Sequence, residues 1–128
     1  MCALNEVKGM KLIMNKKQRL QLIKKDLINS NKILNAISDE NRQKILLVLL
    51  ENCTTGGIRV EDIAKQVNLS RPAVSHHLKL LFDEKIVSIE KDGTKNYYHI
   101  TGAQELLKLK SLINNIEMYL EERKEELK

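Results

Sequence analysis

The chain contains few aromatic residues, prolines or cysteines. Of its 128 residues, 3% are aromatic, one is proline and two are cysteine. So little aromatic and proline content favours a mostly helical chain. Cys2 and Cys53 are too few for a disulfide framework and form no C-x-x-C pair, so we expect both thiols to be reduced.

Long apolar runs and catalytic motifs are also missing. No run approaches the roughly 18 apolar residues that cross a bilayer, and the opening MCALNEVKGMKLIM lacks the ordered regions of a secretory signal. We therefore expect a cytoplasmic protein with no membrane partner. The chain has no glycine-rich phosphate loop and no evident Ser/His/Asp or Cys/His arrangement, so we expect no enzyme and no cofactor.

Charge is abundant and unevenly distributed. The net charge is +5, and residues 1–30 account for all of it, with seven basic and two acidic side chains. We expect residues 1–15 to form a flexible basic arm and residues 16–128 to form a single domain. The basic segment either follows a DNA backbone or is the solvated face of a helix. We favour the second alternative because Leu20, Ile23 and Leu27 give this helix a packing role.

Apolar spacing predicts helices in the first half of the chain. A helix is expected over residues 16–37, although Asn29, Ser30 and Asn31 could divide it into two. In SDENRQKILLVLLEN, Ser38 or Asp39 can cap a second helix, and TTGG ends it. The buried stripe expected for this second helix comprises Ile45, Leu46, Leu49 and Leu50.

The next two elements have the spacing of a helix-turn-helix over about residues 60–82. The first helix has apolar residues at Val60, Ile63, Ala64 and Val67, and the turn NLS follows it. Ser70 can cap the second helix, and Pro72 suits its first turn. Counting about 100° per residue places one set of residues inward, Val74, Leu78 and Leu81, and another outward, Pro72, His76, Lys79 and Asp83.

A hairpin is expected over about residues 86–100. IVSIEKDGTKNYYHI alternates apolar and polar residues on both sides of Asp92-Gly93. A helix-turn-helix followed by such a hairpin describes a winged helix-turn-helix, a mostly α fold with a small β-hairpin wing. Its second helix fits the major groove of double-stranded DNA. The candidate DNA-binding residues are Ser70, Arg71, Ser75, His76, His77, Lys79, Lys91, Thr94 and Lys95.

The two histidines are expected to have different roles. His76 points outward and can bond a base edge. His77 lies about 60° from the centre of the buried stripe, so it either braces the helix or reaches a phosphate. Because adjacent helical side chains diverge by about 100°, the two cannot easily share one metal ion.

The last segment, residues 104–128, has apolar residues in heptad spacing, which favours pairing with another helix. The apolar residues of this seam are Leu106, Leu109, Ile113, Ile116 and Leu120.

The region from about Ile33 to Ile100 resembles the ArsR/SmtB family of prokaryotic winged-helix repressors. Asp39 and Arg42 match the D-x-x-R pattern at the start of the family's second helix. The recognition helix matches at Leu69, Ser70, Val74, Ser75, His77 and Leu78, and the wing at Gly93, Tyr97 and Tyr98. The resemblance implies a homodimeric repressor that binds an imperfect inverted repeat and releases it when an inducer arrives. It also implies that the first and last helices, about 16–37 and 104–128, build the dimer. The candidate interface residues are Leu20, Ile23, Leu27, Leu106, Leu109, Ile113, Ile116 and Leu120.

The family's usual metal sites have no counterpart here. Where the family has E-L-C-V-C-D-L, this chain has GIRVEDI over residues 57–63, so Arg59 and Glu61 replace the two cysteines. The other family site needs a histidine in the last helix, but none follows His99. We therefore expect no bound metal, and the inducer is unknown. Two alternatives remain open, a winged-helix module that binds a protein partner and a thiol-responsive regulator that uses Cys53.

Overall fold

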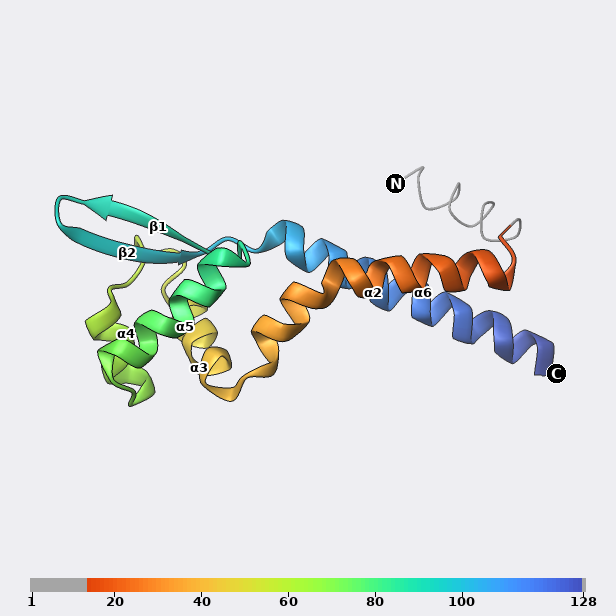
Figure 1. Ribbon diagram of the computed structural model, residues 1–128, viewed down its shortest axis with the longest axis horizontal. Coiled ribbons are helices and arrows are strands. Elements are labelled where there is room, and N and C mark those ends of the chain that lie inside the picture. Colours follow the sequence, from red (N-terminus) through yellow and green to blue (C-terminus); the bar gives the residue numbers. More distant parts are fainter. Residues whose placement is uncertain (1–13, 128) are drawn as a thin grey trace. The chain divides into compact units, whose positions relative to one another are not determined.

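The computed structural model describes residues 14–127, which fall into two compact units (Figure 1). Of the described residues, one unit combines 14–30 with 108–127, and the other is 31–107. The expected arm lies almost wholly outside the described residues, and the single domain from residue 16 onward stays a prediction. The elements are α2 (Lys16–Ser38), α3 (Glu40–Glu51), α4 (Val60–Val67), α5 (Arg71–Asp83), β1 (Val87–Asp92), β2 (Lys95–Ile100) and α6 (Ala103–Leu127).

The unit of residues 31–107 is a winged helix, as the sequence predicts. A three-residue turn, 68–70, joins α4 to α5. Asn68 ends α4 in the left-handed conformation, with φ 57° and ψ 47°, which asparagine tolerates better than most residues. The Ser70 hydroxyl then accepts a hydrogen bond from the Ala73 backbone N–H at 3.2 Å, which caps α5. The expected start of the recognition helix is therefore confirmed.

The core of this unit is formed by one apolar stripe from each helix. In α5, Val74, Leu78 and Leu81 are fully buried, as expected from their spacing. The stripe predicted for α3 was partly wrong, because Val48 is buried whereas Leu50 is 52% exposed. Leu50 lies about 140° around the helix from Ile45, while Val48 and Leu49 continue the Ile45 face. The remaining buried side chains include Ile63, Ala64, Val67, Ile86 and Val87.

A polar corner joins α2 to α3. α2 continues through Asn29, Ser30 and Asn31 as one helix and ends at Ser38. Asp39 caps α3 by accepting the Arg42 backbone N–H at 3.0 Å. The Arg42 side chain turns back and donates to the carbonyl oxygens of Ala36 and Asn35, each at 2.9 Å. The D-x-x-R motif therefore satisfies backbone groups at the end of one helix and the start of the next.

The wing is a two-stranded antiparallel hairpin with a short third segment beside it. Val87 pairs with Ile100 and Asp92 with Lys95, which leaves Gly93 and Thr94 as the loop. Gly93 has φ +64°, as a two-residue hairpin loop with glycine first requires. Ile58, before α4, exchanges two backbone hydrogen bonds with Tyr98 at 3.2 and 2.8 Å. The sequence analysis missed this pairing.

In the other unit, α2 and α6 are joined by polar contacts. Arg19 is only 3% exposed, and it donates to Asn115 Oδ1 and forms an ion pair with Glu122, both at 3.2 Å. Asp26 accepts hydrogen bonds from Ser111 and Asn115 at 3.0 and 2.6 Å. Arg19 contacts Asn115 and Glu122, whereas Asp26, which lies later in α2, contacts the earlier α6 residues Ser111 and Asn115. The two segments therefore run antiparallel. The prediction that the basic segment is a solvated face is wrong for Arg19.

Two neighbouring glycines provide a test of the close approach between the 56–58 loop and β2. Gly56 and Gly57 have φ of +89° and +91°, so alanine is strained at both. A Cβ at Gly57 would also lie 2.7 Å from the His99 ring and 2.9 Å from the Tyr98 carbonyl oxygen, whereas Gly56 has open space. We expect Gly57→Ala to be less stable than Gly56→Ala by about 1–3 kcal/mol. Thermal unfolding of both variants measures this difference, and equal losses would contradict the close approach.

Candidate nucleic-acid interface

The outward face of α5 carries most of the residues predicted to contact DNA. Ser70, Arg71, Ser75, His76 and Lys79 are all exposed, as are Pro72 and Asp83. The helix N-terminus adds the positive end of its dipole to this face. The Ser70 oxygen uses a lone pair to cap α5, so its O–H remains available as a donor. The face thus offers donors to phosphates and to base edges.

His77 is placed differently from the other predicted DNA-binding residues. Its side chain is 15% exposed, and Nδ1 lies 4.0 Å from Asp39 Oδ2, at the cap of α3. The neighbouring His76 ring is exposed, with its centroid 5.9 Å from the His77 ring. The structure therefore favours the bracing role for His77, and a DNA contact by this residue stays a prediction.

The Asp39 carboxylate caps α3 and lies near His77 of α5. The hydrogen bond from the Arg42 backbone N–H holds the pKa of the Asp39 carboxyl below its usual value. The Arg42 and His77 charges also lower this pKa, while desolvation opposes them. The carboxylate that caps α3 therefore stays ionised at neutral pH and faces the inner side of the recognition helix.

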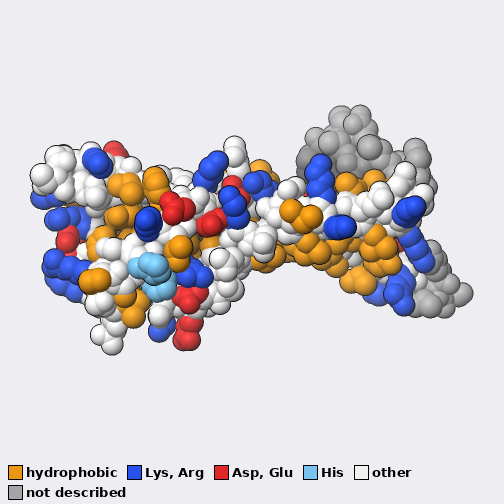
Figure 2. Space-filling view, in the orientation of Figure 1, with side chains coloured by type: hydrophobic (Ala, Val, Ile, Leu, Met, Phe, Trp, Pro, Cys, Tyr) orange, Lys and Arg blue, Asp and Glu red, His pale blue; other side chains and the backbone are white. Residues whose placement is uncertain are grey.

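The wing presents its polar residues at the hairpin tip. Lys91, Thr94 and Lys95 are exposed there, around the Asp92 to Lys95 pair that closes the loop. Figure 2 shows Lys and Arg side chains gathered at the end of the winged-helix unit where the hairpin tip lies, with histidine exposed on the same view. Nearer the base, His99 Nε2 lies 3.2 Å from Glu90 Oε2.

Two further charged residues at this unit's surface were missed as functional candidates. Arg59 immediately precedes α4, and Glu61 lies in its first turn. Arg59 Nε is 2.7 Å from Glu61 Oε1, and Arg71 Nη1 is 4.0 Å from Glu61 Oε2. In the sequence, Arg59 and Glu61 stand out only as replacements for family cysteines, because one sequence does not reveal that the starts of α4 and α5 approach each other.

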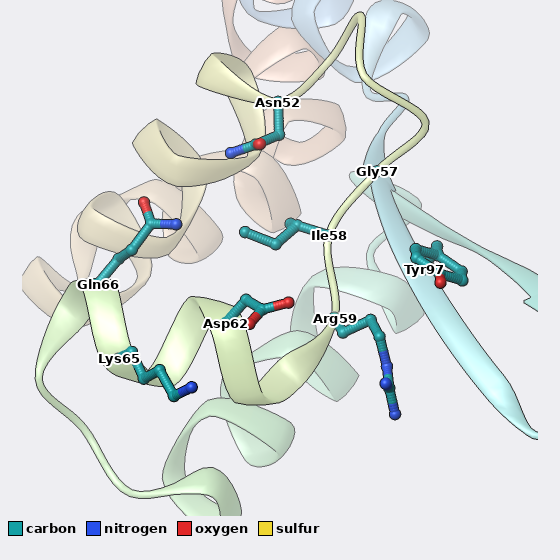
Figure 3. Close-up of a pocket in the computed structure, with 8 residues that line it drawn as sticks. All are labelled: Asn52, Gly57, Ile58, Arg59, Asp62, Lys65, Gln66 and Tyr97. Carbon is teal, nitrogen blue, oxygen red and sulfur yellow. The ribbon is translucent and has the colours of Figure 1, made fainter.

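A pocket of about 370 Å³ lies beside the start of α4 (Figure 3). Asn52, Ile58 and Gln66 face this space, whereas the Arg59 guanidinium points away from it. Other lining residues carry both signs of charge, Asp62 and Lys65. The pocket is therefore lined by charges of both signs, whereas a strongly charged ligand would require a lining of the opposite charge.

The described part of the chain also bears on three other features, namely a reactive cysteine, a metal site and a membrane-spanning helix. Cys53 is exposed just after α3, while Cys2 lies outside residues 14–127. Within those residues, no three His, Cys, Asp or Glu side chains form a group that could hold a metal ion. None of the helices described is both long and apolar enough to cross a membrane.

Comparisons with known proteins identify the family. The model for the bacterial regulatory protein, arsR family, matches residues 39–88. The chain is 39% identical over 70 residues to the transcriptional repressor SdpR of Bacillus subtilis (strain 168), a match that covers 55% of this chain and 73% of that repressor. It is 35% identical over 71 residues to an arsenical resistance operon repressor of Staphylococcus aureus, with 56% and 64% covered.

A solved structure agrees with these sequence matches. Reduced HlyU from Vibrio cholerae N16961 has a TM-score of 0.60 at 25% identity, over 72% of this chain and 93% of that one. The expectation of a winged-helix transcriptional regulator rather than an enzyme is confirmed. The chain belongs to the ArsR family of bacterial regulatory proteins and is a DNA-binding transcriptional regulator.

Proposed function

We propose that the chain represses transcription as a homodimer that binds an inverted-repeat operator, with α5 of each copy in the major groove. The exposed outward face of α5 is the observation that carries this proposal, since it combines a helix N-terminus with Arg71, Ser75 and His76. Arg71 can bond phosphate or guanine, and the serine and histidine can bond base edges. Lys91, Thr94 and Lys95 on the wing contact the flanking backbone or minor groove.

The dimer part of the proposal rests on apolar side chains that are exposed in the described part of the chain. In α6, Ile113, Ile116 and Leu120 are all exposed, Ile113 to 49%. They lie about 170° around the helix from the mean direction of Ser111, Asn115, Met118 and Glu122, the side that faces α2. Figure 2 shows apolar side chains along this unit.

A second copy of the chain is the occupant that fits this seam. Leu20 and Leu27 are also exposed, one heptad apart in α2. Burying such rows against a second helix pair removes them from water, and the heptad spacing matches helix pairing. In this proposal Leu106, Leu109 and Ile23 extend the interface.

The proposed regulator works without the family's metal sites. At the position of the family's first metal cysteine, Arg59 forms an ion pair with Glu61, and a cation there opposes binding of a metal ion. In this proposal, any signal that releases the operator is therefore not a metal ion bound at this position.

Selection of duplexes from a random DNA library tests the operator proposal. We expect the full chain to enrich an inverted repeat, because a two-fold symmetric dimer presents two copies of α5. The half-site centres should lie about 10 base pairs apart, or a multiple of this. Sequencing after several rounds gives the answer, and enrichment of a single half-site or of no motif would contradict the proposal.

Substituting the two neighbouring histidines one at a time distinguishes a DNA contact from a side chain that stabilises the packing of α5. His76→Ala should lower operator affinity by about 1–3 kcal/mol with unchanged thermal stability, since its ring is exposed. His77→Ala should destabilise the fold by about 1–3 kcal/mol, because its ring is largely buried beside Asp39. Binding titrations and thermal unfolding are measured on both variants. Loss of stability in His76→Ala, or none in His77→Ala, would reverse the assignment.

Charges placed in the α6 seam test the dimer. Ile113→Glu combined with Ile116→Glu should convert the dimer to monomer in analytical ultracentrifugation, because like charges would face each other at apolar positions. Leu107→Glu combined with Asn114→Glu is the matched control, since both residues are exposed and lie well outside the seam. A dimeric seam variant, or equal dissociation of the control, would place the interface elsewhere.

A further inference from the structure

Glu61 lies between two arginines at the start of the helix-turn-helix. Its two carboxylate oxygens are separately engaged, Oε1 by Arg59 Nε at 2.7 Å and Oε2 by Arg71 Nη1 at 4.0 Å. Arg59 precedes α4 and Arg71 is the first residue of α5. One acid thus lies within ion-pairing distance of an arginine at the start of each helix.

The burial of Glu61 indicates that this arrangement is specific. The Glu61 side chain is 25% exposed, and its Oε1 atom is buried without a well-directed hydrogen bond from any residue that the structure describes. A buried carboxylate oxygen is costly unless a cation compensates it. Arg59 supplies that charge, so the acid and the arginine hold each other in place.

The surface around this cluster suits a phosphate better than a carboxylate. Two helix N-termini contribute partial positive charge there, and the two guanidinium groups can each bind a phosphate oxygen pair. Arg59 makes no side-chain cap to α4, so its guanidinium is not needed to start that helix. Arg71 belongs to the exposed face of α5 that the proposed function places on DNA.

We propose that Arg59 is a further phosphate contact, and that Glu61 is an internal competitor that phosphate displaces from Arg59 and Arg71. The inference rests on the proposed function, because it concerns the same DNA-binding surface. Binding then exchanges a carboxylate for a phosphate at each arginine. Where both arginines contact phosphates, this exchange weakens binding to every DNA sequence by the same amount, so base contacts account for a larger share of the remaining affinity.

The test measures binding of the full chain to a short labelled duplex of mixed sequence over a range of salt concentrations. Glu61→Gln should bind about 3- to 10-fold tighter at low salt, because both arginines are released for phosphate. Asp62→Asn is the matched control. It removes an acid from the same first turn of α4, and Asp62 lines the pocket, whereas the ion pair of Arg59 is with Glu61. The control should change affinity by less than about 2-fold.

The salt dependence identifies the phosphate contact. Arg59→Gln should make the slope of log affinity against log salt shallower by about 0.9, the value for one lost phosphate contact. In the Arg59→Gln background, Glu61→Gln should raise affinity less than it does in the wild-type chain. Thermal unfolding of each variant shows that it is folded.

Three results would overturn the inference while leaving the proposed function standing. Weaker binding of Glu61→Gln would mean that the acid positions the arginines for DNA. Equal gains in DNA affinity from Glu61→Gln and Asp62→Asn would mean that the effect comes from net charge alone. An unchanged slope of log affinity against log salt in Arg59→Gln would mean that Arg59 does not contact a phosphate. Failure of the wild-type chain to bind duplex DNA with salt dependence would instead refute the proposed function itself.

Discussion

The capped corner between α2 and α3 is the constraint on which the winged-helix unit depends. Asp39 accepts the Arg42 backbone N–H, and Arg42 satisfies the carbonyl oxygens of Asn35 and Ala36. Without these bonds, both helix ends would leave polar backbone groups unpaired. Asp39 also faces His77 on the inner side of α5. The corner therefore fixes where α3 starts and places Asp39 beside α5, the helix whose outward face is proposed to contact DNA.

Charge placement matters more than total charge for this regulator. Residues 31–128 carry equal numbers of acidic and basic side chains, so no overall field attracts DNA to this part of the chain. In the proposed function, local features attract DNA instead, namely the dipole of α5, the lysines at the wing tip and the arginines beside Glu61. In the proposed mechanism this arrangement keeps general attraction low, so that affinity depends on the groups that reach base edges.

The accuracy of the sequence-based predictions followed how local each signal was. The cap by Ser70, the Val74, Leu78 and Leu81 stripe and the hairpin around Gly93 were predicted correctly, because each depends on residues within a few positions. Leu50 was misplaced because two helical phases fit a run of leucines, and packing selects one of them. The contacts of Arg19 with α6 involve partners about 100 residues away, which apolar periodicity does not reveal.

By itself, the sequence determined the winged-helix class, the family and the side of α5 that faces outward. Helical and strand periods, helix caps and turns each depend on a few neighbouring residues. A short stretch of sequence is therefore enough to predict them. Only the tertiary structure decided that His77 lies beside Asp39, that Ile58 adds a segment beside β2 and that Glu61 lies between Arg59 and Arg71. Each of these contacts depends on how separate elements pack, and that packing follows from the whole core rather than from any local pattern.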